Sequence, residues 1–111
     1  MKGPYQDFLG KKGRSLSSLN IRGRALQRID ALDAVKVLRS LELPILGGDV
    51  YFERDGLIEP AYCNWHAEKL DEESFSDFVE RSCEITQSYI ERFPETIDRV
   101  SLFVFVTPSE P

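Results

Sequence analysis

Residues 43–65, LPILGGDVYFERDGLIEPAYCNW, decide the fold. Two runs rich in β-branched and aromatic residues flank the dipeptide Asp55-Gly56. Because this dipeptide accepts the positive φ angles of a two-residue type I′ turn, the stretch predicts a β-hairpin. Pro60 lies in the second run, and proline cannot donate a hydrogen bond to a neighbouring strand. It therefore indicates an edge strand or a bulge there.

Two glycines interrupt the first strand of this hairpin. Gly47 and Gly48 would weaken strand pairing, so they indicate a bulge or a close approach of two backbones. Asp49 follows them and places a carboxylate at the irregular point. Two interpretations stay open for it. It can accept hydrogen bonds from nearby backbone N–H groups, or it can belong to a binding surface.

A first amphipathic helix is predicted before the hairpin. Asp30 can cap its N-terminus, and Ile29 can pack over its first turn. The apolar side chains that follow recur at helical spacing: Ala31, Leu32, Ala34, Val35, Val37, Leu38 and Leu41. Pro44 would end the helix, because the residue before a proline is pushed towards an extended conformation.

A second amphipathic helix is predicted after the hairpin. Ser74 can cap it, with Asp77 at the capping-box position, and Pro94 would stop it. The positions with helical spacing are Phe75, Phe78, Val79, Ser82, Ile85, Thr86, Tyr89, Ile90 and Phe93. This pattern predicts a helix of about five turns whose apolar stripe is core.

Two further strands are predicted, one at each end of the chain. Residues 19–26 alternate apolar or small side chains with arginines, a strand pattern that Gly23 weakens. Residues 100–106 are nearly all apolar, which is typical of a strand covered on both faces and central in its sheet.

The resulting element order is β-α-β-β-α-β, which predicts an α+β fold. Its four-stranded, mainly antiparallel sheet would carry two helices on one face, as in the ferredoxin-like plan. Right-handed crossovers would place the first and last strands in the middle and the hairpin strands outward. Another strand order is the alternative. At 111 residues we expect one domain, with residues 1–18 as a partly ordered lead-in and 107–111 as a frayed tail.

The charge is distributed unevenly along the chain. Residues 1–40 carry nine Lys/Arg and three Asp/Glu, a net charge of +6, whereas residues 41–111 carry five and sixteen, a net charge of −11. An acidic surface disfavours nucleic acid as a partner. It complements a basic protein, although such a surface can also serve only solubility.

Composition also bears on location. No run of 18 apolar residues is present, so we expect no membrane span, and the N-terminus lacks the apolar region of a signal peptide. Two cysteines, Cys63 and Cys83, do not make a disulfide framework. We therefore expect both to be reduced and the protein to be cytoplasmic.

The sequence offers little for catalysis or metal binding. Cys63 and His66 could form a nucleophilic pair, but a packed cysteine beside a surface histidine is the simpler interpretation. One histidine and two cysteines do not supply a zinc site. The Gly47-Gly48-Asp49 turn is similar to that of nucleotide cyclases, yet the phosphate-binding basic residues are not evident. We expect no catalytic activity, no metal and no cofactor.

Four segments together resemble one protein family. They are residues 44–51 (PILGGDVY), 62–65 (YCNW), 72–82 (EESFSDFVERS) and 102–106 (LFVFV). The chain is similar, over about residues 13–106, to the immunity protein 40 family of bacterial polymorphic toxin systems. The glycine-containing block followed by the Tyr-x-Asn-Trp segment is the specific part of this resemblance.

The resemblance implies a cytosolic immunity protein, encoded beside a toxin, that binds and neutralises the toxin domain without catalysis of its own. An acidic surface suits a basic partner such as a nuclease-like toxin. Our candidates for toxin contacts on the hairpin are Asp49, Tyr51, Tyr62, Asn64 and Trp65. Those on the acidic segment that follows are Glu68, Asp71, Glu72, Glu73 and Asp77. For Trp65 a core position, and for the acidic segment a merely solvated loop, are the competing interpretations.

A second function is compatible with the sequence. A small ligand-binding or regulatory module could use the same scaffold. It predicts a concave pocket near Asp49 and Tyr62.

Overall fold

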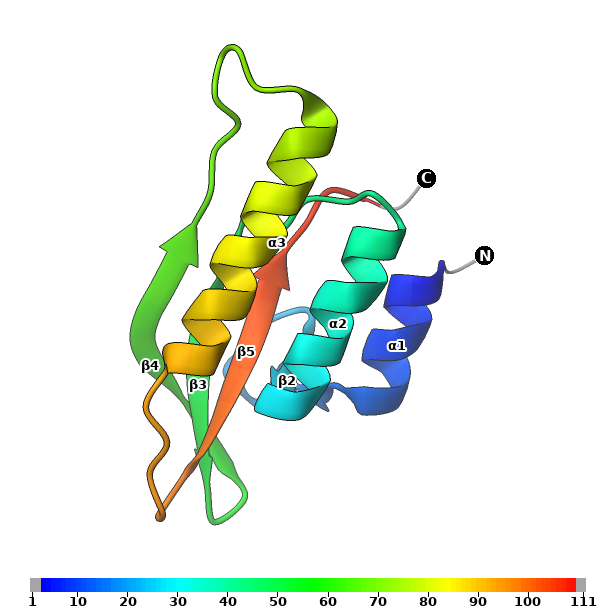
Figure 1. Ribbon diagram of the computed structural model, residues 1–111. Helices are drawn as coiled ribbons and strands as arrows, with labels where there is room; N and C mark the ends of the chain where they lie inside the picture. Colours follow the sequence, from blue (N-terminus) through cyan, green and yellow to red (C-terminus); the bar gives the residue numbers. More distant parts are fainter. Residues whose placement is uncertain (1–2, 110–111) are drawn as a thin grey trace.

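A computed structural model describes residues 3–109 of the 111-residue chain. It contains α-helices, strands and one 3-10 helix, labelled in chain order (Figure 1). These are α1 (Pro4–Lys12), β1 (Arg14–Ser15), η1 (Ser17–Leu19), β2 (Arg24–Gln27), α2 (Arg28–Ser40), β3 (Gly47–Arg54), β4 (Leu57–His66), α3 (Phe75–Arg92) and β5 (Val100–Val106). The α+β class is confirmed.

The strands form one sheet with the order β1-β2-β5-β3-β4, in which all neighbours are antiparallel. The prediction that the last strand is central is confirmed, because β5 lies between β2 and β3. The ferredoxin-like plan is wrong in detail. The sheet has a fifth strand, and β3 also lies inside the sheet, because it pairs with β5 on one side and with β4 on the other.

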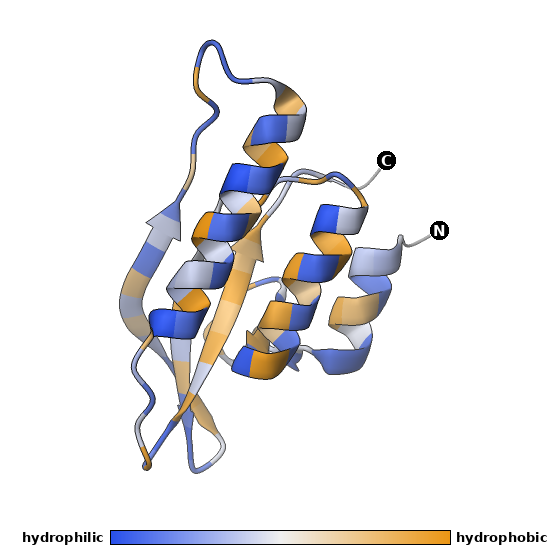
Figure 2. Ribbon diagram, viewed as in Figure 1, coloured by the Kyte–Doolittle hydropathy of each residue, from blue (hydrophilic) through white to orange (hydrophobic). Residues whose placement is uncertain are grey.

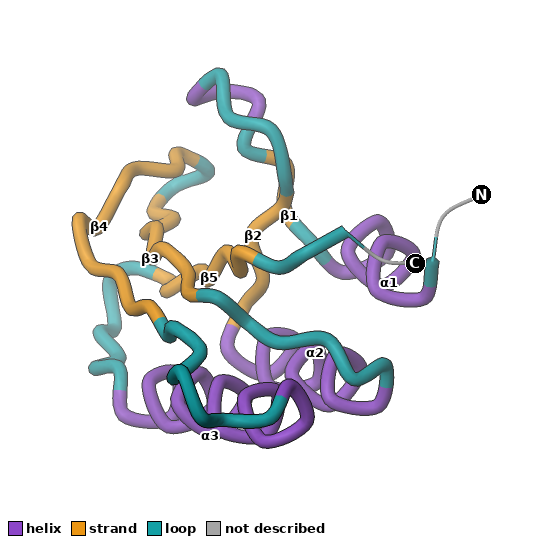
Figure 3. The backbone as a smooth tube through the Cα atoms, turned by 90° about the horizontal axis from the view of Figure 1, so that it is seen from above, coloured by secondary structure: helices purple, strands orange, loops and turns teal. Residues whose placement is uncertain are grey.

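The helices α2 and α3 lie on the same face of the sheet and α1 packs beside α2, whereas residues 13–23, here called the N-terminal segment, cross the other face (Figure 3). The main core fills the space between sheet and helices. Its fully buried side chains include Val35, Leu38, Ile45, Ile90 and Phe103. Figure 2 shows β5 as largely apolar, in keeping with its central place.

The predicted turn of the hairpin is confirmed. Asp55 and Gly56 have φ angles of 53° and 78°, the positive values that a type I′ turn requires. Pro60 lies on β4, which is an edge strand of the sheet, as predicted. The register between β3 and β4 also shifts near this proline, which is the predicted irregularity.

Gly47 and Gly48 mark a close approach of backbones. A Cβ atom on Gly48 would lie 2.3 Å from the Val104 carbonyl oxygen and 2.4 Å from Cη2 of Trp65. A Cβ on Gly47, whose φ is 151°, would lie 2.4 Å from the Trp65 carbonyl oxygen. The glycines therefore let β3 fit between β4 and β5.

The two predicted helices are present with small differences at their ends. Ser74 caps α3 as predicted, because its Oγ accepts a hydrogen bond from the Asp77 N–H at 3.0 Å. The helix α2 begins at Arg28, before Asp30, and its N-cap Gln27 makes no side-chain cap bond. The packing predicted for Ile29 is wrong, since this side chain is 70% exposed.

The N-terminal region differs most from the prediction. The strand expected over residues 19–26 covers only Arg24–Gln27, because residues 17–19 form η1 and Asn20 turns the chain with a φ of 58°. A helix of nine residues, α1, lies in the stretch that was expected to be a partly ordered lead-in. Tyr5 and Leu16 are both buried, so this region contributes to the core.

The ends of the chain carry no further element. Residues 107–109 have no regular secondary structure, and the rest of the predicted tail, like residues 1–2, lies outside the described residues. Within residues 3–109, none of the helices combines the length and the apolar character that a membrane crossing needs.

Candidate functional site

The face of the sheet opposite the helices is only partly covered. Side chains of β3 alternate between the two faces, so Val50 joins the main core while Tyr51 joins a second cluster on the other side. There the N-terminal segment buries Leu16 together with Tyr51 and Leu102. The cover extends to η1, which contacts β4.

Six further side chains lie on the same side of the sheet, and one of them, Val104, packs against this second cluster. We name this set the open face: Asp49, Tyr62, Asn64, His66, Val104 and Val106. Register places Asp49 between Asn64 of β4 and Val104 of β5. Tyr62 is 89% exposed and Val106 is 49% exposed. Three hairpin residues that the sequence nominated, Asp49, Tyr62 and Asn64, therefore share one exposed surface.

Tyr51, another nominated residue, lies at the border of the open face. It is 9% exposed because the N-terminal segment packs over it. Burial raises the pKa of its phenol, and the neighbouring Asp49 carboxylate raises it further. Among the described residues, no hydrogen bond or ion pair holds the Asp49 carboxylate itself. It therefore stays open to solvent beside Tyr51.

Trp65 points to the opposite side and lies in the main core. It is 7% exposed, its Nε1 donates a hydrogen bond to Oγ1 of Thr86 at 3.0 Å, and its ring stacks on Tyr89 at 4.6 Å. A buried indole usually needs such a partner for its N–H. The structure therefore gives Trp65 a packing role and leaves it without an exposed ring.

The acidic loop, residues 68–73, connects β4 to α3 and rises above the sheet (Figure 1). Glu73 holds this loop in place by hydrogen bonds to Leu70 of the loop and to Arg81 of α3. Its carboxylate accepts two hydrogen bonds from Arg81 at 2.7 and 2.9 Å and one from the Leu70 N–H at 3.1 Å. Arg81 also donates to the carbonyl oxygen of Glu68. The hydrogen bonds from Arg81 lower the pKa of Glu73 to about 2.

The remaining nominated acids point into solvent. Glu68, Asp71 and Glu72 lie on the acidic loop, and Asp77 lies in the first turn of α3. Two apolar side chains stand among them, since Leu70 is 60% exposed and Phe75 is 53% exposed. Lys69 is the one basic residue of the loop, so the charges beside these apolar groups are mainly negative. Apolar groups among charges mainly of one sign are typical of a surface that binds a protein of opposite charge.

The structure separates the one pair of residues that suggested catalysis. Cys63 packs against the main core and its Sγ donates a hydrogen bond to the Ala61 carbonyl oxygen at 3.5 Å, whereas His66 lies on the open face. Cys83 is buried in α3, and burial raises the pKa of its thiol, which keeps it protonated. Within residues 3–109, His, Cys, Asp and Glu side chains form no cluster of three or more that could hold a metal.

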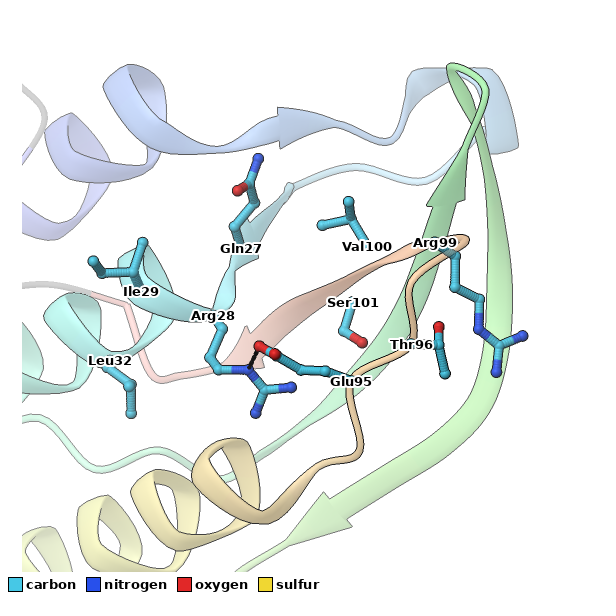
Figure 4. Close-up of a pocket in the computed structure, with 9 residues that line it drawn as sticks. All are labelled: Gln27, Arg28, Ile29, Leu32, Glu95, Thr96, Arg99, Val100 and Ser101. Carbon is cyan, nitrogen blue, oxygen red and sulfur yellow. Dashed lines mark hydrogen bonds and ion pairs between the residues drawn. The ribbon is translucent and has the colours of Figure 1, made fainter.

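A cavity of about 440 Å³ lies elsewhere, between the start of α2 and the start of β5 (Figure 4). Arg28 occupies one wall, where its Nε pairs with Glu95 at 2.8 Å and its guanidinium donates to the carbonyl oxygens of Ile90 and Phe93. Arg28 thus caps the C-terminal end of α3. In Figure 4 the Arg99 side chain points away from this pair, and it covers the Phe52 ring at 3.7 Å.

A second cavity of similar size is lined by residues of α1, η1 and the segment before β2. Neither of these two cavities is lined by Asp49 or Tyr62. The pocket that the ligand-binding hypothesis predicted near those residues therefore does not coincide with either. Of the polar side chains of the first cavity, Arg28 and Glu95 pair with each other and Arg28 also binds the end of α3, which indicates a role of this pair in holding the fold.

Sequence reasoning missed several members of these two surfaces. His66, Val104 and Val106 on the open face, and Leu70 and Phe75 beside the acidic loop, were not nominated. A signal existed for His66, because alternation along residues 57–66 assigns it to the same face as Asn64. Val104 and Val106 join that face only through the pairing of β5 with β3. For Leu70 and Phe75 the sequence held no comparable signal, since their apolar character alone predicts burial.

Comparison with known proteins gives one result. No curated protein and no solved structure matches the chain. The family model described as immunity protein 40 matches residues 15–107, which is most of the chain and includes the hairpin, α3 and β5. The chain therefore belongs to the immunity protein 40 family.

Proposed function

We propose that this chain is an immunity protein that binds the toxin domain encoded beside it and neutralises it by stoichiometric protein–protein inhibition. The single observation that carries this proposal is the family match over residues 15–107. The proposal includes a cytoplasmic location, where the free thiols of Cys63 and Cys83 would stay reduced.

The charge of the surface supports a basic partner. Residues 41–111, which form the hairpin, the acidic loop, α3 and β5, carry a net charge of −11. Glu68, Asp71 and Glu72 are exposed, and no hydrogen bond or ion pair among the described residues engages their carboxylates. Such charges attract a basic toxin before contact and raise its association rate. A nuclease-like toxin, whose own substrate is anionic, fits this description.

The first test is co-expression with the C-terminal domain of the neighbouring polymorphic toxin. Cell survival and co-purification are scored together. We expect survival and a 1:1 complex with a Kd in the nanomolar range or below, which corresponds to a binding free energy of about −12 kcal/mol. Survival without a complex would contradict direct inhibition, and death of the cells would contradict the proposed pairing.

The second test addresses the acidic loop. The double variant Asp71→Lys/Glu72→Lys should lower the association rate by about tenfold at low salt, because both charges then repel a basic partner. The matched control is Glu84→Lys/Glu91→Lys, which makes the same change in net charge on exposed positions further along α3. Equal effects of the two double variants would show that only net charge matters and would contradict a role of the loop.

A further inference from the structure

Tyr62 has a backbone conformation that is unusual for its residue type. Its φ angle is 58°, in the left-handed region of backbone conformations. Residues other than glycine, asparagine and aspartate rarely adopt this region. The other non-glycine residues with positive φ in the described chain are Asn20, Glu42 and Asp55. They end η1, follow α2 and form the hairpin turn, where this conformation is ordinary. Tyr62 alone among them lies within a strand.

A bulge on β4 produces this conformation. Asp49 pairs with Asn64 and Tyr51 pairs with Pro60, so one residue of β3 stands opposite three of β4. Two extra residues keep the alternation of faces, and Ala61 and Cys63 both pack on the main core. Tyr62 between them is directed away from the helices and is 89% exposed. A bulge that re-aims one side chain is a common feature of functional sites.

Nothing in the fold uses this ring. Tyr62 belongs to neither hydrophobic cluster, and among residues 3–109 its ring makes no aromatic or cation–π contact. Asparagine or glycine would adopt the same φ at lower cost. No aromatic or cation–π contact of the ring among residues 3–109 offsets the cost of this backbone conformation. The strain therefore points to a role of Tyr62 in a complex with a partner.

The surroundings of Tyr62 define what could bind it. Asp49 and Asn64 lie beside it on the open face with exposed polar groups, and Asp49 has no partner among the described residues. Beyond His66 the open face leads into the acidic loop. Backbone pairing continues at this end of the sheet, because the Ala67 N–H donates a hydrogen bond to the Leu46 carbonyl oxygen and the Leu46 N–H donates one to the Val106 carbonyl oxygen. Asp49 and three exposed carboxylates of the acidic loop, on Glu68, Asp71 and Glu72, outnumber the one lysine of that loop, Lys69, and they complement lysine or arginine side chains.

We infer that Tyr62 is the anchor residue of the toxin-binding surface, an inference that rests on the proposed function. Its ring enters an apolar depression on the toxin domain, and Lys or Arg side chains at the rim of that depression pair with Asp49 and with the acidic loop. Tyrosine is well suited to such a position, because it supplies a large contact area and a hydroxyl at a small cost in conformational entropy.

Protection of the sheet edge is the competing explanation for the bulge, since irregular edge strands resist pairing with another chain. Pro60 already interrupts that edge, and edge protection does not need an aromatic side chain. The two explanations therefore predict different results for a substitution that keeps the bulge and removes the ring.

The experiment uses purified full-length variants and the inactivated C-terminal domain of the neighbouring toxin as the binding probe. Tyr62→Asn keeps the left-handed backbone and should weaken binding by at least about 30-fold, the effect that marks a hot spot, without lowering Tm. Tyr62→Phe should keep most of the affinity. Leu57→Asn is the matched control, since this exposed side chain lies on the same strand away from the open face, and it should bind as the wild type does.

Each other outcome has a defined meaning. Wild-type affinity for Tyr62→Asn overturns the inference and leaves the proposed function standing, and added self-association of that variant would assign the bulge to edge protection. A large loss of Tm in Tyr62→Asn shows that the ring supports the fold and also overturns the inference. Failure of the wild-type chain to bind the toxin domain overturns the proposed function and the inference with it.

Discussion

The two faces of the sheet meet different requirements, and β4 contributes to both. On the helix side Trp65 is 7% exposed, hydrogen-bonded and stacked, whereas on the open face Tyr62 is 89% exposed and its ring makes no aromatic or cation–π contact among residues 3–109. These two aromatic residues are three positions apart on one strand. The difference shows that alternation along a single edge strand separates the residues that stabilise the fold from those available to a partner.

The helix side is built as an aromatic cluster. Trp65, Tyr89, Phe93, Phe103 and Phe105 have ring centroids between 4.6 and 6.5 Å apart in their contacting pairs. Each such pair adds roughly 0.5–1.5 kcal/mol beyond the burial of area. We therefore expect changes on this side to alter stability, and changes on the open face to alter binding.

The largest effect is expected for Trp65→Ala. It removes the ring from the centre of the cluster and leaves the Thr86 hydroxyl without its partner, so the free energy of unfolding should fall by about 3–5 kcal/mol. Urea unfolding followed by circular dichroism measures this. Tyr62→Ala is the control and should change stability by less than about 0.5 kcal/mol. Comparable losses in the two variants would contradict the division between the faces.

A smaller effect is expected for Gly48→Ala. Its Cβ would meet the Val104 carbonyl oxygen at 2.3 Å and the Trp65 ring at 2.4 Å, so strands must shift, at a cost of about 1–3 kcal/mol. Gly10→Ala is the matched control, because its Cβ meets nothing within 4 Å and it lies in α1. It should raise stability by about 0.5–1 kcal/mol. Thermal unfolding measures both changes in stability. An unchanged stability in Gly48→Ala would show that β3 lies further from Val104 and Trp65 in solution than this close approach implies.

The smallest effect concerns the acidic loop and pH. The pKa of Glu73 is about 2 in the folded protein and ordinarily 4.5, so the folded state favours the charged form. Its stabilising contribution is complete above pH 4.5 and is lost as the pH falls towards 2. Glu73→Gln should therefore flatten the pH dependence of unfolding in this window, whereas Glu72→Gln, which is exposed and unpaired among the described residues, should not. An unchanged slope in Glu73→Gln would mean that Arg81 does not hold this carboxylate.

The sequence was informative where one local signal dominates. Asp55-Gly56 predicts the hairpin turn, Ser74 predicts the start of α3, and the apolar run at residues 100–106 predicts the central strand. It failed in the N-terminal region, where Leu16 is buried only because the chain folds back over the sheet, a contact that no local pattern encodes. The strand order depends on the same long-range pairing.

The candidate surfaces were predictable in part. Alternation could have added His66 to Asn64, because both lie on one strand. Asp49, Val104 and Val106 join them only through the register of β3, β4 and β5. The positive φ of Tyr62 could not be read from its sequence, because tyrosine normally avoids that region. The pairing of Glu73 with Arg81 likewise depends on how the loop folds onto α3.

Hydrogen–deuterium exchange of the free protein and of its complex with the inactivated toxin domain tests the central claim most directly. We predict the strongest added protection in residues 60–73, which span the end of β4 and the acidic loop, with little change in α1 and α2. Protection confined to α1 and α2 would place the toxin on the opposite side of the molecule. It would contradict the assignment of binding to the open face.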